Sequence, residues 1–246
     1  MWALGLGLSV LIGVTLGLLG GGGSILTVPI LVYVFGLEPH PAIATSLLVV
    51  GTTSLVALVP HARAGRVNLK TGLTFGLAGM AGAFLAGRVS AYVAGRTLLV
   101  GFALLMVVAA IAMFRGRRDD TAVRPLAPLK TAVLGLVVGS VTGLVGAGGG
   151  FVIVPALVLL GGLPMPMAIG TSLLVIALQS AAGLVGHLGE VDLDWRLAGA
   201  VTTAAVLGSF VGSRLAGKFS PSTLRRGFGV FVLVMAAWML FKELGP

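Results

Sequence analysis

The stretch GLLGGGGSILTVP, which runs over Gly17–Pro29, returns later in the chain as GLVGAGGGFVIVP, over Gly143–Pro155. The two copies lie 126 residues apart, and the same offset aligns TSLLV at Thr45–Val49 with TSLLV at Thr171–Val175. Chance is a poor explanation for a match of this length with identical glycine, proline and Thr-Ser positions. The chain is therefore predicted to be a duplicated unit.

The duplication divides the chain into three parts. Residues 1–114 form the predicted first transmembrane repeat, residues 131–246 form the second, and residues 115–130 form a basic cytoplasmic linker between them. Further along the repeats, His61 aligns with His187 and Arg88 with Arg214. Because the glycine tract occurs twice in an apolar setting, it is not an engineered flexible linker.

The composition places both repeats in a membrane. Of the 246 residues, 57% are hydrophobic and 9% are charged, whereas soluble domains are about 25% charged. An ordinary soluble domain and a disordered chain are both excluded, and the predicted fold class is an all-α polytopic membrane protein in a lipid bilayer. The net charge of +9 is assigned to basic loops on the cytoplasmic side and not to a nucleic-acid partner. The chain has no cysteine, so a disulfide or thiolate site is excluded.

Ten apolar stretches follow one another along the chain. Two of them, Ser24–Gly36 and Gly149–Gly161, have only 13 residues and reach about 20 Å, so they are predicted to be half-helices or arms of re-entrant hairpins. The N-terminal residues lack a basic region and a cleavage site, so no signal peptide is expected. The other eight stretches are Trp2–Leu19, Pro41–Pro60, Lys70–Tyr92, Thr97–Phe114, Thr131–Val145, Met167–His187, Trp195–Gly217 and Gly227–Phe241.

Equivalent loops of the two repeats carry opposite charges. The segment His61–Lys70 contains three Lys or Arg residues and no acid, and the matching segment Leu188–Trp195 contains three acids and no base. The positive-inside rule then favours opposite sides of the membrane for the two loops and an odd number of crossings per repeat. Five helical elements per repeat, or three full spans with a re-entrant hairpin, both satisfy this parity. The prediction is a pair of inverted-topology repeats, an architecture typical of secondary transporters.

The predicted membrane interior lacks carboxylates, because all seven acidic residues lie in loops or near ends. Buried carboxylates usually mark cation and proton pathways, so a carboxylate relay is not expected. The sequence also lacks the zinc-protease, phosphate-loop and nucleophile-elbow motifs. We therefore expect no catalytic residues, no metal site and no cofactor, and we do not expect an enzyme.

The glycine tracts are the predicted substrate site. Each tract lets the chain break and opens a short helix, whose free N–H groups and positive dipole end favour an anion. The alternative is close helix packing through small residues. The candidate substrate-binding residues of the tracts are Gly20, Gly21, Gly22, Gly23 and Ser24 in the first repeat and Gly146, Gly148, Gly149 and Gly150 in the second.

Hydroxyl and amide side chains could complete this site. Thr45 and Ser46, with their copies Thr171 and Ser172, could donate to an oxyanion, or could only bond carbonyls of the preceding helical turn. Gln179 is a mid-span amide that marks either substrate selectivity or a bond between helices.

Six further residues are assigned structural or gating roles. Pro29 and Pro155 are predicted to break and shape the short helices. The candidates for gating are His61, His187, Arg88 and Arg214. The alternative for the histidines is a solvated helix cap, and the alternative for the arginines is snorkelling at helix ends.

The paired pattern GLLGGGGSILTVP…ATSLL and GLVGAGGGFVIVP…GTSLL resembles the TauE/SafE family of sulfite and sulfonate exporters over nearly the whole chain. The resemblance implies an inner-membrane permease for small anions such as sulfite and sulfoacetate. The matching glycines, prolines and Thr-Ser pairs are the residues it carries over.

The resulting prediction is a secondary transporter that moves a small sulfur-containing anion across the cell membrane, outward because an inside-negative potential favours exit of an anion. A channel or carrier for another metabolite is the first alternative, and an intramembrane enzyme the second. The glycine-rich helix faces are also compatible with a homodimer.

Overall fold

The computed structural model describes residues 2–20, 22–115, 127–145, 150–188, 191–215 and 218–244, and these residues form helices without any strand. The first half contains five helices: α1 (Trp2–Leu19), α2 (Gly22–Tyr33), α3 (Pro39–Arg63), α4 (Leu69–Ser90) and α5 (Gly95–Arg115). The second half contains α6 (Pro128–Val145), α7 (Gly150–Pro155) with the π-helical segment η1 (Ala156–Leu160), α8 (Met165–His187), α9 (Trp195–Leu215) and α10 (Pro221–Leu244).

The predicted all-helical membrane fold is confirmed. Among the described residues, seven helices are long and apolar enough to cross a membrane, and two shorter apolar helices accompany them. The short ones are α2 and the α7–η1 segment, at the places where the sequence predicts the two short stretches. The helix α9 is not among the seven, since it carries Arg196, Arg214 and several hydroxyl side chains. The protein is a multi-pass membrane protein.

Local sequence explains where several helices begin and end. Gly20 has a φ of 71° and ends α1, and Gly36 and Gly65 have φ of 74° and 67° in the turns after α2 and α3. Such φ values are strained for residues with a Cβ. The helix α4 begins after Asn68, whose side chain accepts a hydrogen bond from the Thr71 N–H at 3.0 Å, an N-cap that replaces a missing partner within the helix.

The two halves are interlocked by glycine contacts between helices. The helix α1 packs along α9, and α6 packs along α4. A Cβ on Gly13 would overlap the Ala205 carbonyl oxygen, and one on Gly139 would overlap the Gly79 carbonyl oxygen. Small residues permit this approach of helix backbones in membranes. The first helix of each half therefore packs on the fourth helix of the other half.

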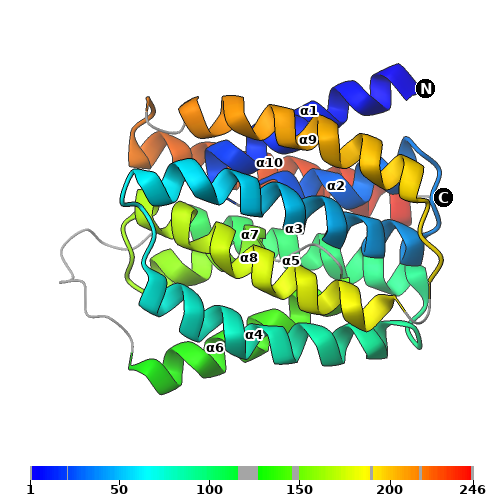
Figure 1. Cartoon of the computed structure of the whole chain (residues 1–246). Helices are drawn as coiled ribbons and strands as arrows, with labels where there is room; N and C mark the ends of the chain where they lie inside the picture. The colour runs from blue at the N-terminus through cyan, green and yellow to red at the C-terminus, as the bar shows by residue number, and fades with distance from the viewer. Residues whose placement is uncertain are drawn as a thin grey trace.

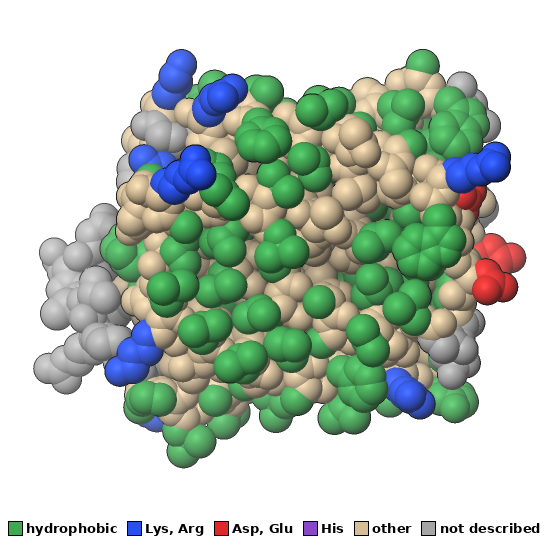
Figure 2. Space-filling model, in the orientation of Figure 1, with side chains coloured by type: hydrophobic (Ala, Val, Ile, Leu, Met, Phe, Trp, Pro, Cys, Tyr) green, Lys and Arg blue, Asp and Glu red, His purple; other side chains and the backbone are tan. Residues whose placement is uncertain are grey.

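The central helices α3 and α8 run in opposite directions, and the two termini lie at the same end of the bundle (Figure 1). Charged side chains gather at the two ends of the bundle, and the surface between the ends is mostly apolar (Figure 2). We call the end with Arg63, Arg66 and Arg214 the basic end. The opposite end, with Glu38 and Asp192, is the acidic end. This arrangement is what inverted repeats require, while the side on which each end lies in the cell, and the repeat boundaries, stay predictions.

Candidate functional site

The helices α3 and α8 cross at the middle of the bundle. Gly51 is the middle residue of α3, and a Cβ added to it would lie 3.0 Å from the Ser180 Cβ of α8. Ser54 lies one turn beyond Gly51 on the same face of α3, and it occupies the position of Ser180 in the first repeat. Ser180 therefore lies at the crossing itself, and its copy Ser54 lies one turn away on the face of α3 that meets α8.

The hydroxyls of both serines are buried and lack a hydrogen-bond partner within the described part of the chain. Helical hydroxyls usually donate to the carbonyl of the preceding turn, as Ser9 does to Gly5 at 2.8 Å and Thr27 does to Gly23 at 2.8 Å. A buried polar group without a partner costs about 1–3 kcal/mol. Ser54 and Ser180 thus present donor groups that a ligand or water can satisfy.

A second pair of copies, Thr53 and Gln179, directly precedes the two serines in the chain. Gln179 of α8 is buried, and its Oε1 accepts a hydrogen bond from Thr142 Oγ1 of α6 at 3.3 Å. Its Nε2 has no partner among the described residues and lies against Gly79 of α4. The equivalent residue of the first repeat, Thr53, also has a buried hydroxyl without a partner. Gln179 therefore makes a contact between helices and still keeps a donor available.

The polar groups in the middle of the bundle are neutral. The acidic residues that the structure describes, Glu38, Asp192, Asp194 and Glu243, lie in loops or at helix ends. Within the described ranges, no three His, Asp or Glu side chains gather closely enough to hold a metal ion. Neutral donors without nearby carboxylates suit a ligand that only accepts hydrogen bonds, such as an oxyanion.

The first glycine tract contacts the second repeat. Ser172 Oγ donates to the Gly20 carbonyl at 3.0 Å and also lies 2.7 Å from the Ile169 carbonyl. Thr171 Oγ1 accepts the backbone N–H of Asn68 at 2.9 Å. These two hydroxyls form hydrogen bonds between the halves in this structure, and their predicted substrate contact stays a prediction.

The other predicted site residues are only partly brought together. Gly22 begins α2, Gly23 packs on the Ile12 carbonyl of α1, and Gly150 begins α7. Ser24, Thr45 and Ser46 are buried. Four predicted glycines lie outside the described residues: Gly21, Gly146, Gly148 and Gly149.

The two prolines occupy different settings. Pro29 lies inside the continuous helix α2, whereas Pro155 is the last residue of α7, directly before η1. Because proline lacks an N–H group, it removes a hydrogen bond from the preceding turn. The helix type changes after Pro155 but not after Pro29, a difference between the copies that the repeat did not predict.

Comparison with known proteins identifies the family. Residues 5–239 match the family model described as Sulfite exporter TauE/SafE. The chain belongs to the TauE/SafE family. It is 36% identical over 243 residues to a "Probable membrane transporter protein" of Xylella fastidiosa, covering 95% of this chain and 92% of that one. It is also 29% identical over 255 residues to a similarly named protein of Methanocaldococcus jannaschii, covering 95% and 94%. No solved structure matches the chain with statistical significance.

The two aligned histidines of this TauE/SafE protein lie at opposite ends and differ in their contacts. His187, at the acidic end, has Nδ1 2.8 Å from the Gly183 carbonyl and Nε2 2.9 Å from Ser90 Oγ. His61, at the basic end, has Nε2 3.2 Å from the Gly17 carbonyl, and its Nδ1 has no partner among the described residues. The histidine at the acidic end is therefore satisfied, and the one at the basic end is not.

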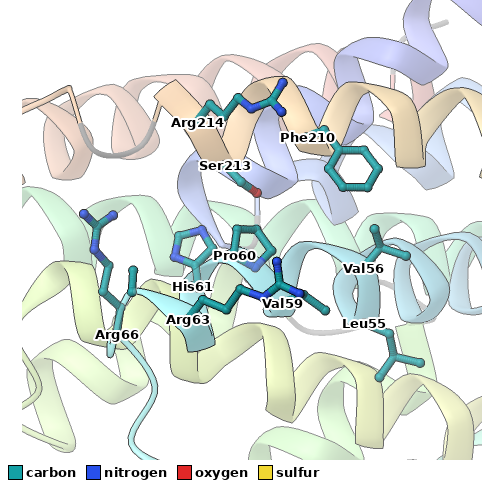
Figure 3. Close-up of a pocket in the computed structure, with 11 residues that line it drawn as sticks. Leu55, Val56, Val59, Pro60, His61, Arg63, Arg66, Phe210, Ser213 and Arg214 are labelled. Atoms are coloured by element: carbon teal, nitrogen blue, oxygen red, sulfur yellow. The ribbon is translucent and has the colours of Figure 1, made fainter.

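The two aligned arginines also differ in this TauE/SafE protein. The Arg88 guanidinium lies 5.7 Å from the centre of the Phe84 ring, a cation–π contact. Arg214 instead lines a cavity with His61 and Ser213 (Figure 3). No sequence motif pointed to Ser213, and only the repeat offset linked Ser54 with Ser180.

Proposed function

We propose that this protein is a secondary transporter that moves a small sulfur oxyanion, such as sulfite, sulfoacetate or another organosulfonate, outward across the cell inner membrane. The observation that carries the proposal is the set of partnerless donors in the middle of the bundle: Thr53, Ser54, Gln179 and Ser180. The family assignment supports an anion of this class.

The donors suit the proposed substrate for a physical reason. A sulfonate or sulfite oxygen accepts hydrogen bonds, so the hydroxyls and the amide can replace part of its hydration shell without a buried cation. A carboxylate at this depth would repel the anion, and the described acidic residues lie away from the crossing. The start of α2 at Gly22 would offer further backbone N–H groups along the path of the substrate.

The proposed direction follows from the charge of the substrate. An inside-negative potential of about 100 mV favours exit of a monoanion by about 2.3 kcal/mol. Outward movement therefore needs no coupling ion. In the transport cycle, the two halves would exchange conformations around the α3–α8 crossing, as inverted repeats permit.

The test is a flux measurement in proteoliposomes that contain the purified protein. We expect saturable efflux of labelled sulfite or sulfoacetate, accelerated by a potential that is negative on the loaded side. Liposomes without protein are the control. Absence of saturable anion flux, or flux of a neutral or cationic solute instead, would contradict the proposal.

A further inference from the structure

A cavity of about 930 Å³ lies at the basic end, between the C-terminal parts of α3 and α9. Figure 3 shows its side chains, which come from both helices and from the loop after α3. Its wall has an apolar side and a polar side. The apolar side includes Leu55, Val59 and Phe210, and the polar side consists of His61, Ser213 and three arginines.

Two polar side chains of this cavity are buried and unpartnered. His61 is 3% exposed and Ser213 is 9% exposed. The Gly17 carbonyl can only accept a hydrogen bond, so His61 Nε2 must carry the proton of this contact. The other ring nitrogen, Nδ1, takes no part in it. Neither His61 Nδ1 nor Ser213 Oγ has a partner among the described residues. Buried polar atoms of this kind are normally satisfied by a ligand or by water.

Positive charge surrounds these two atoms. Arg63 ends α3, Arg66 lies in the loop that follows, and Arg214 lies in the last turn of α9. Figure 3 shows the three arginines on different sides of His61 and Ser213. The carboxylates that the structure describes lie at the acidic end, so none of them neutralises this group. A hollow lined by one sign of charge concentrates counter-ions.

The copy of His61 at the acidic end, His187, has different neighbours. There, Ser90 Oγ lies 2.9 Å from His187 Nε2, and a Cβ on Gly87 would lie 2.9 Å from His187 Nδ1. Gly87 is the copy of Ser213, and Ser90 aligns with an alanine, Ala216, in the second repeat. The two histidines thus differ, since His187 has a partner at each ring nitrogen and His61 lines a cavity.

We propose that the cavity at the basic end is an oxyanion-binding vestibule, which holds the transported anion before it reaches the α3–α8 crossing. Ser213 Oγ donates a hydrogen bond to the anion, and Arg63, Arg66 and Arg214 supply the charge. The identity of the anion as a small sulfonate or sulfite rests on the proposed function. A lipid phosphate offers the same chemistry, so the experiment separates a free anion from a lipid headgroup.

Because the chain has no cysteine, Ser213→Cys places a single thiol in the cavity. The probes are two methanethiosulfonates of similar size, one with a sulfonate group and one with a trimethylammonium group. Ala62→Cys is the matched control, since Ala62 is exposed on α3 at the same end but does not line the cavity. We expect the preference for the sulfonate reagent to be about tenfold stronger at the cavity thiol than at the control thiol, because the cavity focuses positive potential.

Sulfoacetate, which does not react with these reagents, tests occupancy. It should slow modification of the Ser213→Cys protein and leave modification of the Ala62→Cys protein unaffected. Adding Arg214→Gln should raise the sulfoacetate concentration for half-protection about three- to tenfold, a modest effect because Arg214 is exposed. Equal reagent preference at both thiols, without protection by sulfoacetate, would overturn the proposal.

Lipid composition separates the two sources of the oxyanion. The labelling is carried out in nanodiscs of phosphatidylcholine alone and of phosphatidylcholine with phosphatidylglycerol. Protection by sulfoacetate in both supports the vestibule. Protection by phosphatidylglycerol without any effect of sulfoacetate would show a lipid headgroup site and overturn the proposal.

A calorimetric titration with sulfoacetate keeps the proposal testable if the Ser213→Cys protein does not fold. Arg214→Gln should then weaken binding, and Arg196→Gln, at the other end of the same helix, should not. Equal binding by the two variants would contradict the vestibule. Both measurements use purified protein, so they remain decisive even if the flux assay finds no transport.

Discussion

Ser180 of α8 packs directly against Gly51 of α3, with only 3.0 Å between its Cβ and the position that a Cβ on residue 51 would take. The substitution Gly51→Val should therefore force the two central helices apart, and overpacking of this kind costs about 1–3 kcal/mol. We expect a lower thermal stability in detergent and a lower flux. Gly101→Val on α5 is the control, because a Cβ there meets nothing within 4 Å. Equal stability of both variants would contradict the close crossing.

The hydroxyls of Ser54 and Ser180 should affect transport and stability in opposite directions. Removing an unsatisfied buried hydroxyl does not destabilise the fold, whereas losing a donor to an anion costs about 1.5–3 kcal/mol, or roughly tenfold or more in affinity. Ser54→Ala and Ser180→Ala should thus raise the KM for sulfite at unchanged or higher thermal stability. In the control Ser9→Ala, only a bond within α1 is lost, so KM should stay unchanged. An unaltered KM in both serine variants would place the substrate elsewhere.

A substitution at Gln179 can test the effect of a negative charge on transport, because glutamine and glutamate have nearly the same shape. Gln179→Glu replaces the partnerless amide nitrogen with an oxygen that repels an anion when ionised. We expect a strong loss of anion flux in the proteoliposome assay. Thr142→Val, which removes the donor to Oε1 and a bond to the Gly139 carbonyl of its own helix, should have a smaller effect. If Thr142→Val reduced the flux more than Gln179→Glu did, the role of Gln179 would be limited to its hydrogen bond between helices.

The contact between α1 and α9 can be tested with two glycines of the same helix. A Cβ on Gly13 would overlap the Ala205 carbonyl oxygen, while one on Gly7 would meet nothing within 4 Å. Gly13→Ala should lower the free energy of unfolding by about 1–3 kcal/mol or more, and Gly7→Ala should leave it unchanged or raise it slightly, because alanine favours a helix more than glycine does. Equal melting temperatures would show that α1 does not pack on α9 as described.

The inverted arrangement predicts opposite accessibility for two engineered thiols. Ala62→Cys places a thiol at the basic end, and Asp192→Cys places one at the acidic end; both positions are exposed. In intact cells, a membrane-impermeant maleimide should label the Asp192→Cys protein only, since the basic end is expected to face the cytoplasm. Labelling of both thiols from the same side would refute the inverted topology.

Sequence reasoning predicted the elements better than the contacts between them. The repeat offset and the two short apolar stretches predicted α2 and α7, because glycine breaks and length are local properties. The pairing of α1 with α9, and the bond from Ser172 to Gly20, join residues far apart in the chain. The fit between two helix faces depends on how side-chain volumes are arranged in three dimensions. A single sequence does not give that arrangement.

The candidate site shows the same limit of sequence-based prediction at the level of single side chains. The Thr-Ser pairs stand out in the sequence because they repeat, yet Thr171 and Ser172 bond to the other half. The hydroxyls left without partners include those of Ser54 and Ser180, which repeat equally well. Whether a hydroxyl bonds to its own helix depends on its rotamer, so the distinction becomes visible only in the structure.

The exchange of helices between the halves has a consequence for biosynthesis. The helix α1 is made first, but its partner α9 leaves the ribosome only near the end of translation. During that interval the glycine face of α1, including Gly13 and Gly17, has no helix to meet and must be covered by lipid or by the insertion machinery. A nascent chain that stops after the first half would keep this face open, because α9 belongs to the second half.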